Sequence, residues 1–350
     1  MNSSLPPRWI ATGLLLAAAA SSAPPAGARH RGVSWVAGEQ VEEADFESLA
    51  TLGVDWIVQT PFGWQEAVDS PAVRLVTEGH VLWGERDAGL ETTTLLARAQ
   101  GIHTLLKPHL WVRHGGPEAW PGAIAMTRDA DWDAWFASYR EFLLHYARLA
   151  ERLDIEALAV GTELHRAATA RPEAWRQLIA EVRAVYSGKL TYAANWNAEF
   201  EEIAFWDALD WIGIQAYFPL AERERPPLEE LTAAWRRHLP ALEAVHRRAG
   251  KPILFTEIGY RSVAGAAIAP WRWPEESAAE TVDLETQARC YEAFFAAVWP
   301  QPWLAGAFFW KWYPSAKPRW EATWEIDFTP QGKPAEEVLR RHYRESAKVN

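Results

Sequence analysis

The stretch Ile-Glu-Ala-Leu-Ala-Val-Gly-Thr-Glu, residues 155–163, sets the pattern from which the fold can be predicted. A helix-like segment precedes it at 131–153, and its centre is an apolar run without alternation. Such a run is typical of a strand that is buried on both faces of a parallel sheet. The stretch Pro-Ile-Leu-Phe-Thr-Glu at 252–257 has the same form, an apolar strand that ends in a glutamate.

Strand-like and helix-like segments alternate on both sides of this stretch. We expect strands at 32–36, 54–60, 102–110, 155–161, 189–195, 211–216, 252–257 and 305–310. We expect helices at 41–52, 89–100, 131–153, from 172 onward, and at 199–208, 228–249, 281–298 and 335–344. Eight strands, each followed by a helix, predict an α/β fold, a single-domain (β/α)8 TIM barrel over residues 29–350. An open doubly wound sheet is the alternative, but no Gly-x-Gly-x-x-Gly motif follows the first strand.

The N-terminal residues have the features of an export signal. Arg8 precedes a short apolar run at 10–20, and small residues follow it at 21–23 and 26–28. This order is typical of a signal peptide, and the apolar run is too short to span a bilayer comfortably. We therefore expect residues 1–28 to be a cleaved leader. The mature protein would then be secreted or periplasmic, without stable membrane insertion.

Composition narrows the possible functions. The formal net charge is −11 and there is no basic tract, which argues against a nucleic-acid partner. Cys290 is the single cysteine, and His109, His114 and His165 do not have metal-ligand spacing, so we expect no metal and no cofactor. Tryptophan is abundant, with 22 in 350 residues. Indole rings fill cores and also stack on sugar rings, so we expect about half in the core and a minority in a sugar cleft.

Side chains at the C-terminal ends of barrel strands are the candidate site residues, because active sites of such barrels lie there. In chain order they are Gln59, Lys107, His109, Trp111, Thr162, Glu163, Asn195, Trp196, Asn197, Tyr217, Glu257, Trp310 and Trp312. Lys107, His109 and Trp111 alternate, and period-two spacing places all three on one face.

Glu163 and Glu257 stand out because each ends an otherwise apolar strand. A single glutamate in this position could belong to a buried ion pair, but two of them form a more specific pattern. Cleavage of a glycosidic bond uses one protonated carboxyl group, which protonates the leaving oxygen, and one ionised carboxylate. Repulsion between the two carboxylates, together with the exclusion of water from the site, raises the pKa of one member of such a pair.

Two motifs make the chain similar to a known family. Val-Gly-Thr-Glu-Leu at 160–164 and Phe-Thr-Glu-Ile-Gly-Tyr at 255–260 resemble clan A of the glycoside hydrolases, and most closely family 113, a family of β-1,4-mannanases. The resemblance implies that Glu163 is the acid/base and Glu257 the nucleophile. It further implies that Tyr217 hydrogen-bonds the nucleophile and that Trp310 forms the floor of the −1 sugar subsite.

The sequence departs from the clan at one position. Most clan members carry Asn immediately before the acid/base, where it holds the sugar 2-hydroxyl, whereas this chain carries Thr162. Either the hydroxyl of Thr162 serves instead, or the amide of Asn195 or Asn197 takes over. This change bears on the preference for mannose or glucose.

The resemblance implies a retaining hydrolase that cleaves β-1,4-mannosidic bonds in polysaccharides or oligosaccharides by double displacement. Two alternatives stay open. The same mechanism could act on another β-linked glycan, such as a glucan or galactan. The chain could also be a non-catalytic carbohydrate-binding barrel, although such a protein would have no chemical need of both glutamates.

Overall fold

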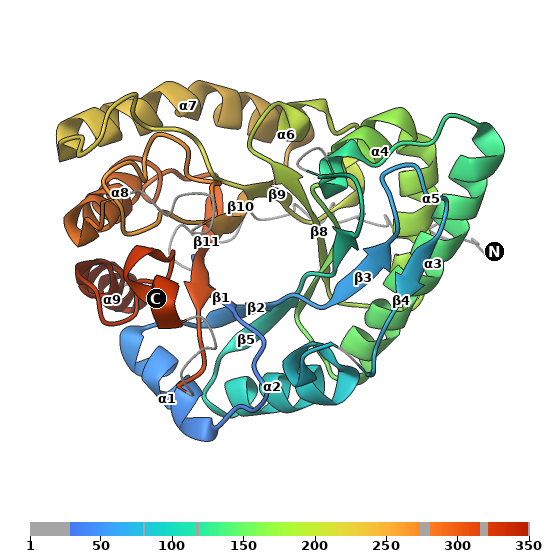
Figure 1. The fold of residues 1–350 in the computed structure, drawn as a ribbon, viewed down its shortest axis with the longest axis horizontal. Coiled ribbons are helices and arrows are strands. Elements are labelled where there is room, and N and C mark those ends of the chain that lie inside the picture. Colours follow the sequence, from blue (N-terminus) through green and yellow to red (C-terminus); the bar gives the residue numbers. More distant parts are fainter. Residues whose placement is uncertain (1–28, 80, 117–118, 274–280, 316–320, 349–350) are drawn as a thin grey trace, which may run out of the picture.

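The computed structural model describes residues 29–79, 81–116, 119–273, 281–315 and 321–348. The predicted leader, residues 1–28, lies outside these ranges. Eight parallel strands close into a barrel, in the order β1, β11, β10, β9, β8, β7, β5, β2 (Figure 1). The strands are β1 (His30–Trp35), β2 (Trp56–Gln59), β5 (His103–Leu106), β7 (Ala157–Thr162), β8 (Lys189–Asn195), β9 (Ile212–Gln215), β10 (Ile253–Ile258) and β11 (Leu304–Trp312). The prediction of a single (β/α)8 barrel is confirmed.

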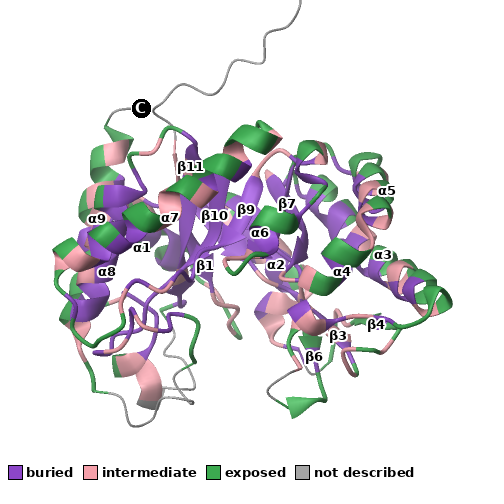
Figure 2. Ribbon diagram, turned by 90° about the horizontal axis from the view of Figure 1, so that it is seen from above, coloured by how far each residue is buried: buried purple, intermediate pink, exposed green. Residues whose placement is uncertain are grey.

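Helices surround the barrel, and their exposed faces form the outer surface while the strands lie buried in the centre (Figure 2). They are α1 (Glu43–Leu52), α2 (Asp87–Ala99), α3 (Asp129–Arg152), α4 (His165–Ala170), α5 (Pro172–Arg183), α6 (Glu199–Glu202), α7 (Leu228–Ala249), α8 (Leu284–Ala297) and α9 (Pro334–Ala347). Within the described ranges, no helix combines the length and the apolar character needed to cross a membrane.

The longest helix shows how the outer shell is held on the barrel. Trp135, Tyr139, Phe142 and Tyr146 of α3 recur every three or four residues and are all buried. This spacing makes one apolar face, which packs toward the strands. The Tyr139 hydroxyl also donates a hydrogen bond of 2.8 Å to the carbonyl of Val160, so α3 is tied to β7 by a polar contact as well.

The barrel interior is filled by a separate layer of side chains. Its buried members are Trp56, Val58, Leu105, Ala157, Leu254 and Phe308. Gly32 on β1 makes room for one of these side chains, because a Cβ atom there would lie 2.2 Å from the ring of Phe308. The interior is therefore a packed core, and the opening that can take a ligand lies at the end of the strands.

A second, small sheet extends from one side of the barrel. It has three strands in the order β4 (Val73–Leu75), β3 (Phe62–Gln65) and β6 (His109–Val112). The prediction of a single strand at 102–110 is thus wrong. The segment forms two strands separated by Lys107 and Pro108, the barrel strand β5 and the strand β6 of this small sheet. Proline has no N–H for the barrel ladder, which favours an interruption at this point.

Candidate functional site

Strand register brings the two glutamates to the same end of the barrel. Glu257 on β10 pairs with Gln215 on β9, and Gln215 pairs with Asn195 on β8. Glu163 follows β7, and its backbone N–H donates a 2.8 Å hydrogen bond to Ala193 of β8. Residues that lie far apart in the sequence therefore line one mouth, at the C-terminal ends of four neighbouring strands.

Glu257 is held by donors on both carboxylate oxygens. The Tyr217 hydroxyl donates to Oε2 at 2.7 Å, and Nζ of Lys107 forms an ion pair and hydrogen bond with Oε1. Only 4% of the residue's surface is exposed. Hydrogen bonds and an opposite charge favour the ionised form of a buried carboxyl group. The surroundings of Glu257 thus suit a carboxylate.

Glu163 has a different environment, in which the described residues provide one side-chain hydrogen bond and no ion pair to a cation. Nδ2 of Asn195 donates to its Oε1 at 3.0 Å. Burial, reinforced by the negative charge of Glu257, raises the pKa of Glu163 to about 7, although Lys107 and the Asn195 hydrogen bond act in the opposite direction. Near neutral pH a large fraction of Glu163 is therefore protonated. The site therefore holds two carboxyl groups in different surroundings, one bound by a cation and a hydroxyl and the other bound by an amide.

Lys107 and His109 complete the polar floor. Lys107 is fully buried, and Nζ also donates to Oε1 of Gln215 at 3.1 Å. Nε2 of His109 lies 4.0 Å from Oε1 of Glu257. Burial and the charge of Lys107 lower the pKa of His109 well below its usual value, so the ring is neutral at pH 7. Its Nε2 is buried and has no hydrogen-bond partner among the described residues.

Indole rings surround the mouth. Trp310, near the end of β11, contacts Trp273 edge-on, with ring centroids 6.3 Å apart. Trp196 stacks on Trp271 with centroids 5.1 Å apart and an interplanar angle of 24°. Trp111 on β6 is 54% exposed. Exposed indole faces next to buried carboxyl groups suit a ligand that is apolar on one face and rich in hydroxyls at its edges, as a sugar ring is.

Within the described part of the chain, no group of three or more His, Cys, Asp or Glu side chains converges to hold a metal ion. The chemistry that the mouth supports is that of its two carboxyl groups. A neutral acid and a carboxylate at one cleft are the pair used for hydrolysis of glycosidic bonds.

Comparison with known proteins agrees with this geometry. The sequence model of Glycoside Hydrolase Family 113 matches residues 31–333. The chain belongs to glycoside hydrolase family 113. It is accordingly a glycoside hydrolase, and its barrel is the fold of that family. No curated protein sequence matches this family 113 chain at a significant level.

Solved structures include two related members of the family. A family 113 β-mannanase from Alicyclobacillus acidocaldarius is 32% identical, with a TM-score of 0.78 over 91% of this chain and 98% of the other. A second structure, a family 113 β-1,4-mannanase, is 27% identical, with a TM-score of 0.75 over 90% and 99% of the two chains. A family 5 mannosidase from Rhizomucor miehei shares the fold. It is 12% identical, with a TM-score of 0.56 over 92% of this chain and 94% of the other.

Most of the residues predicted for the site of this family 113 hydrolase lie at its mouth. Glu163, Glu257, Tyr217, Lys107 and Asn195 are joined by direct hydrogen bonds, in two groups centred on the two glutamates. His109, Trp111, Trp196 and Trp310 lie at the same end. Asn197 is exposed beside them, and its backbone N–H donates to Oδ1 of Asn195 at 2.9 Å. The amide of Asn195 is thus better placed than that of Asn197 to act beside Glu163.

Two predicted residues make contacts that involve neither glutamate of the mouth. Trp56 and Val58 point into the barrel, so the next residue in the alternation, Gln59, points outward. Its Nε2 donates to Oγ1 of Thr94 on α2 at 2.8 Å. Thr162 is 2% exposed, and its hydroxyl donates to the carbonyl of Pro108 at 3.2 Å. The amide nitrogen of Gln59 is engaged by α2 and the Thr162 hydroxyl by Pro108, so these contacts give neither side chain a role in sugar binding.

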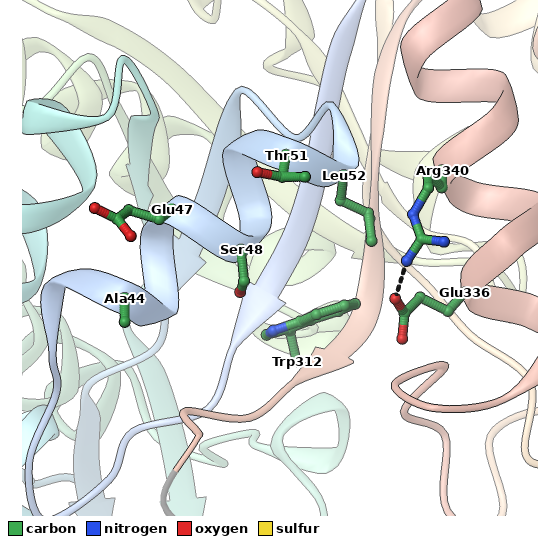
Figure 3. Close-up of a pocket in the computed structure, with 8 residues that line it drawn as sticks. All are labelled: Ala44, Glu47, Ser48, Thr51, Leu52, Trp312, Glu336 and Arg340. Carbon is green, nitrogen blue, oxygen red and sulfur yellow. Dashed lines mark hydrogen bonds and ion pairs between the residues drawn. The ribbon is translucent and has the colours of Figure 1, made fainter.

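Trp312 is also displaced from the predicted position. Only 5% of it is exposed, and it packs in the outer core as the floor of a groove of about 430 Å³ between α1 and α9 (Figure 3). Ser48 and Thr51 of α1 and the ion-paired Glu336 and Arg340 of α9 line this groove. The carboxyl groups of the mouth are not among the residues that line this groove, so the exposed surface of Trp312 lies apart from them.

Three further residues organise the mouth; the sequence indicated Gln215 by its position at a strand end, but Tyr192 and Glu199 were missed. Gln215 receives hydrogen bonds from Lys107 and from Oγ1 of Thr256, each at 3.1 Å. Tyr192 and Glu199 form a buried pair behind Asn195. Gln215 ends its strand, and that position was a usable signal. Tyr192 lies within a strand and Glu199 at the start of a short helix, where no local pattern indicates a role.

Proposed function

We propose that this family 113 hydrolase cleaves β-1,4-mannosidic bonds with net retention of anomeric configuration, with Glu257 as nucleophile and Glu163 as acid/base. The observation that carries the proposal is the contrast between the two carboxyl groups. Lys107 and Tyr217 favour the ionised form of Glu257, while burial and the nearby charge of Glu257 raise the pKa of Glu163 to about 7. A nucleophile must be ionised and a general acid must hold its proton.

In the first step a carboxylate oxygen of Glu257 attacks the anomeric carbon and the bond to the leaving oxygen breaks. Glu163 transfers its proton to that oxygen, and a covalent glycosyl ester forms on Glu257. In the second step Glu163, now ionised, takes a proton from water while the water oxygen attacks the same carbon. Glu257 leaves as a carboxylate, which Lys107 and Tyr217 stabilise again through their hydrogen bonds.

The proposed substrate rests on the relatives and on the aromatic mouth. The two family members of 32% and 27% identity are described as a β-mannanase and a β-1,4-mannanase. The exposed indoles of Trp111 and Trp271 offer flat surfaces on which successive sugar rings can stack. Together these features favour a polysaccharide or oligosaccharide of β-1,4-linked mannose over other β-linked glycans.

Product analysis tests the mechanism and the substrate together. Purified protein is incubated with β-1,4-mannohexaose, and with gluco- and galacto-oligosaccharides of similar length, while proton NMR follows the first anomer released. We expect cleavage of the mannan substrate with the β-anomer appearing first. Glu257→Ala should abolish hydrolysis, and Glu163→Ala should lower it by about 10²–10⁴-fold. Early release of the α-anomer, or cleavage of the other glycans alone, contradicts the proposal.

We also propose that residues 1–28 direct export and are removed. The sequence order of basic, apolar and small residues supports this. Expression of the full chain followed by N-terminal sequencing of the protein recovered outside the cytoplasm tests it. An intact N-terminus, or a protein retained inside the cell, contradicts it.

A further inference from the structure

Glu199, the first residue of α6, connects two loops of the mouth through hydrogen bonds in the buried layer beneath them. The residue is fully buried. Its Oε1 accepts a hydrogen bond of 2.5 Å from the Tyr192 hydroxyl, and its Oε2 accepts one of 2.6 Å from the backbone N–H of Asn195. The Tyr192 hydroxyl in turn accepts a 2.8 Å hydrogen bond from the backbone N–H of Leu164. One carboxyl group therefore connects the loop after β8 with the residue that follows Glu163.

Both connected loops have backbone conformations that need support. Glu163 has φ of +54°, and Ala198, directly before Glu199, has φ of +64°. The left-handed region costs a residue with a side chain about 1–2 kcal/mol, so it persists only where surrounding contacts hold it. The N–H of Leu164, next to Glu163, is one such contact. Asn195 is the other, because its backbone is bound by Glu199 and its side chain binds Glu163.

We propose that Glu199 is a positioning residue for proton transfer, which acts through Tyr192 and Asn195 to hold the Glu163 carboxyl group in its working orientation. The inference rests on the proposed role of Glu163 as acid/base. Glu199 is fully buried and its two hydrogen-bond partners are Tyr192 and the backbone of Asn195, so it acts on the substrate through the residues it holds. It differs in this from Lys107 and Tyr217, which bind Glu257 directly.

The charge of Glu199 fits this role. Burial raises the pKa of Glu199 to about 8, with the hydrogen bonds from Tyr192 and Asn195 acting against the shift and the charges of Glu163 and Glu202 adding to it. Of these groups, Glu202 of α6 is paired with His165 of α4 at 2.7 Å. Below pH 8 Glu199 is mostly neutral, so it adds little negative charge beside Glu163. A neutral amide in its place should therefore be tolerated.

The chemical test compares two leaving groups in the full-length protein. A β-1,4-mannooligosaccharide releases a sugar alkoxide, which needs a proton from the acid. A dinitrophenyl β-mannobioside releases a stable phenolate, which needs none in the first step. Because kcat/KM reports steps up to the first irreversible one, a defect in proton donation lowers it for the oligosaccharide alone. A loss of folded protein lowers it equally for both.

Four variants are compared on both substrates. Glu199→Ala and Tyr192→Phe should lower kcat/KM for the oligosaccharide by at least about tenfold, with less than about threefold change for the dinitrophenyl glycoside. Glu199→Gln keeps a carbonyl oxygen for the Asn195 N–H and should retain most of the activity. Glu201→Gln, on the same helix but exposed, is the matched control and should equal wild type.

Equal losses on the two substrates, or no loss in Glu199→Ala, would overturn the positioning role. Tyr192→Phe preserves the ring volume, so it gives an answer even where Glu199→Ala folds poorly. Glu163→Ala measured in parallel separates this inference from the proposed function. If Glu163→Ala itself shows no dependence on the leaving group, the acid/base assignment has failed. If the loss in Glu163→Ala depends on the leaving group, but the losses in the Tyr192 and Glu199 variants do not, only the positioning role has failed.

Discussion

The charge of Glu257 acts on the titration of Glu163, and this effect can be measured at the scale of single residues. The charge of Glu257 is a cause of the raised pKa of Glu163, and Lys107 opposes it. In Glu257→Gln the like charge is removed while Lys107 stays, so the ionised form of Glu163 becomes easier to reach. We expect the pKa of Glu163 to fall below its wild-type value of about 7, as followed by carbon-13 NMR of labelled glutamate carboxyl groups.

Glu163→Gln in the same experiment assigns the signal, because the resonance of that carboxyl group must disappear. The wild-type activity should follow the same titration. The acid form is present below about pH 7, so kcat/KM on oligosaccharides should decline as the pH rises through that value. An unchanged or higher pKa of Glu163 in Glu257→Gln would mean that burial alone sets it.

Strand β1 shows how the packing of one element depends on a glycine. A Cβ atom on Gly32 would lie 2.2 Å from the Phe308 ring, which sits between strands in the packed barrel interior. Gly32→Ala should therefore destabilise the fold by about 1–3 kcal/mol or more, as measured by urea unfolding. Phe308→Leu, a smaller side chain, should recover part of the loss when the two changes are combined. Additive losses in the double variant would show that the clash is not the cause.

The whole barrel depends on its first strand, which begins directly after the predicted leader. β1 pairs with both β11 and β2, so it closes the ring. Arg29 precedes it and donates to the carbonyl of Gln301 at 3.2 Å. Deletion of residues 1–28 should leave the melting temperature within about 2 °C and the activity intact. Deletion of residues 1–36 should abolish folding, because β11 and β2 would lose their shared partner; a folded, active product would contradict this.

Much of the site was predictable because its signals are local. Glu163 and Glu257 each end an apolar run, and Tyr217, Trp310, Lys107 and Asn195 lie at or just after the ends of strands that must meet in a barrel. The errors have a common origin in the direction of side chains. Gln59 and Thr162 also end strands, yet Gln59 is directed toward Thr94 of α2 and the Thr162 hydroxyl is engaged by the Pro108 carbonyl.

The sequence by itself determined the α/β order, the barrel and the pair of glutamates, because burial periodicity and strand ends are properties of short segments. Only the tertiary structure decided which side chains meet. Lys107 and Glu257 are 150 residues apart, and the link from Leu164 through Tyr192 to Glu199 crosses three elements. Such contacts depend on strand register and on closure of the ring, which no local pattern encodes.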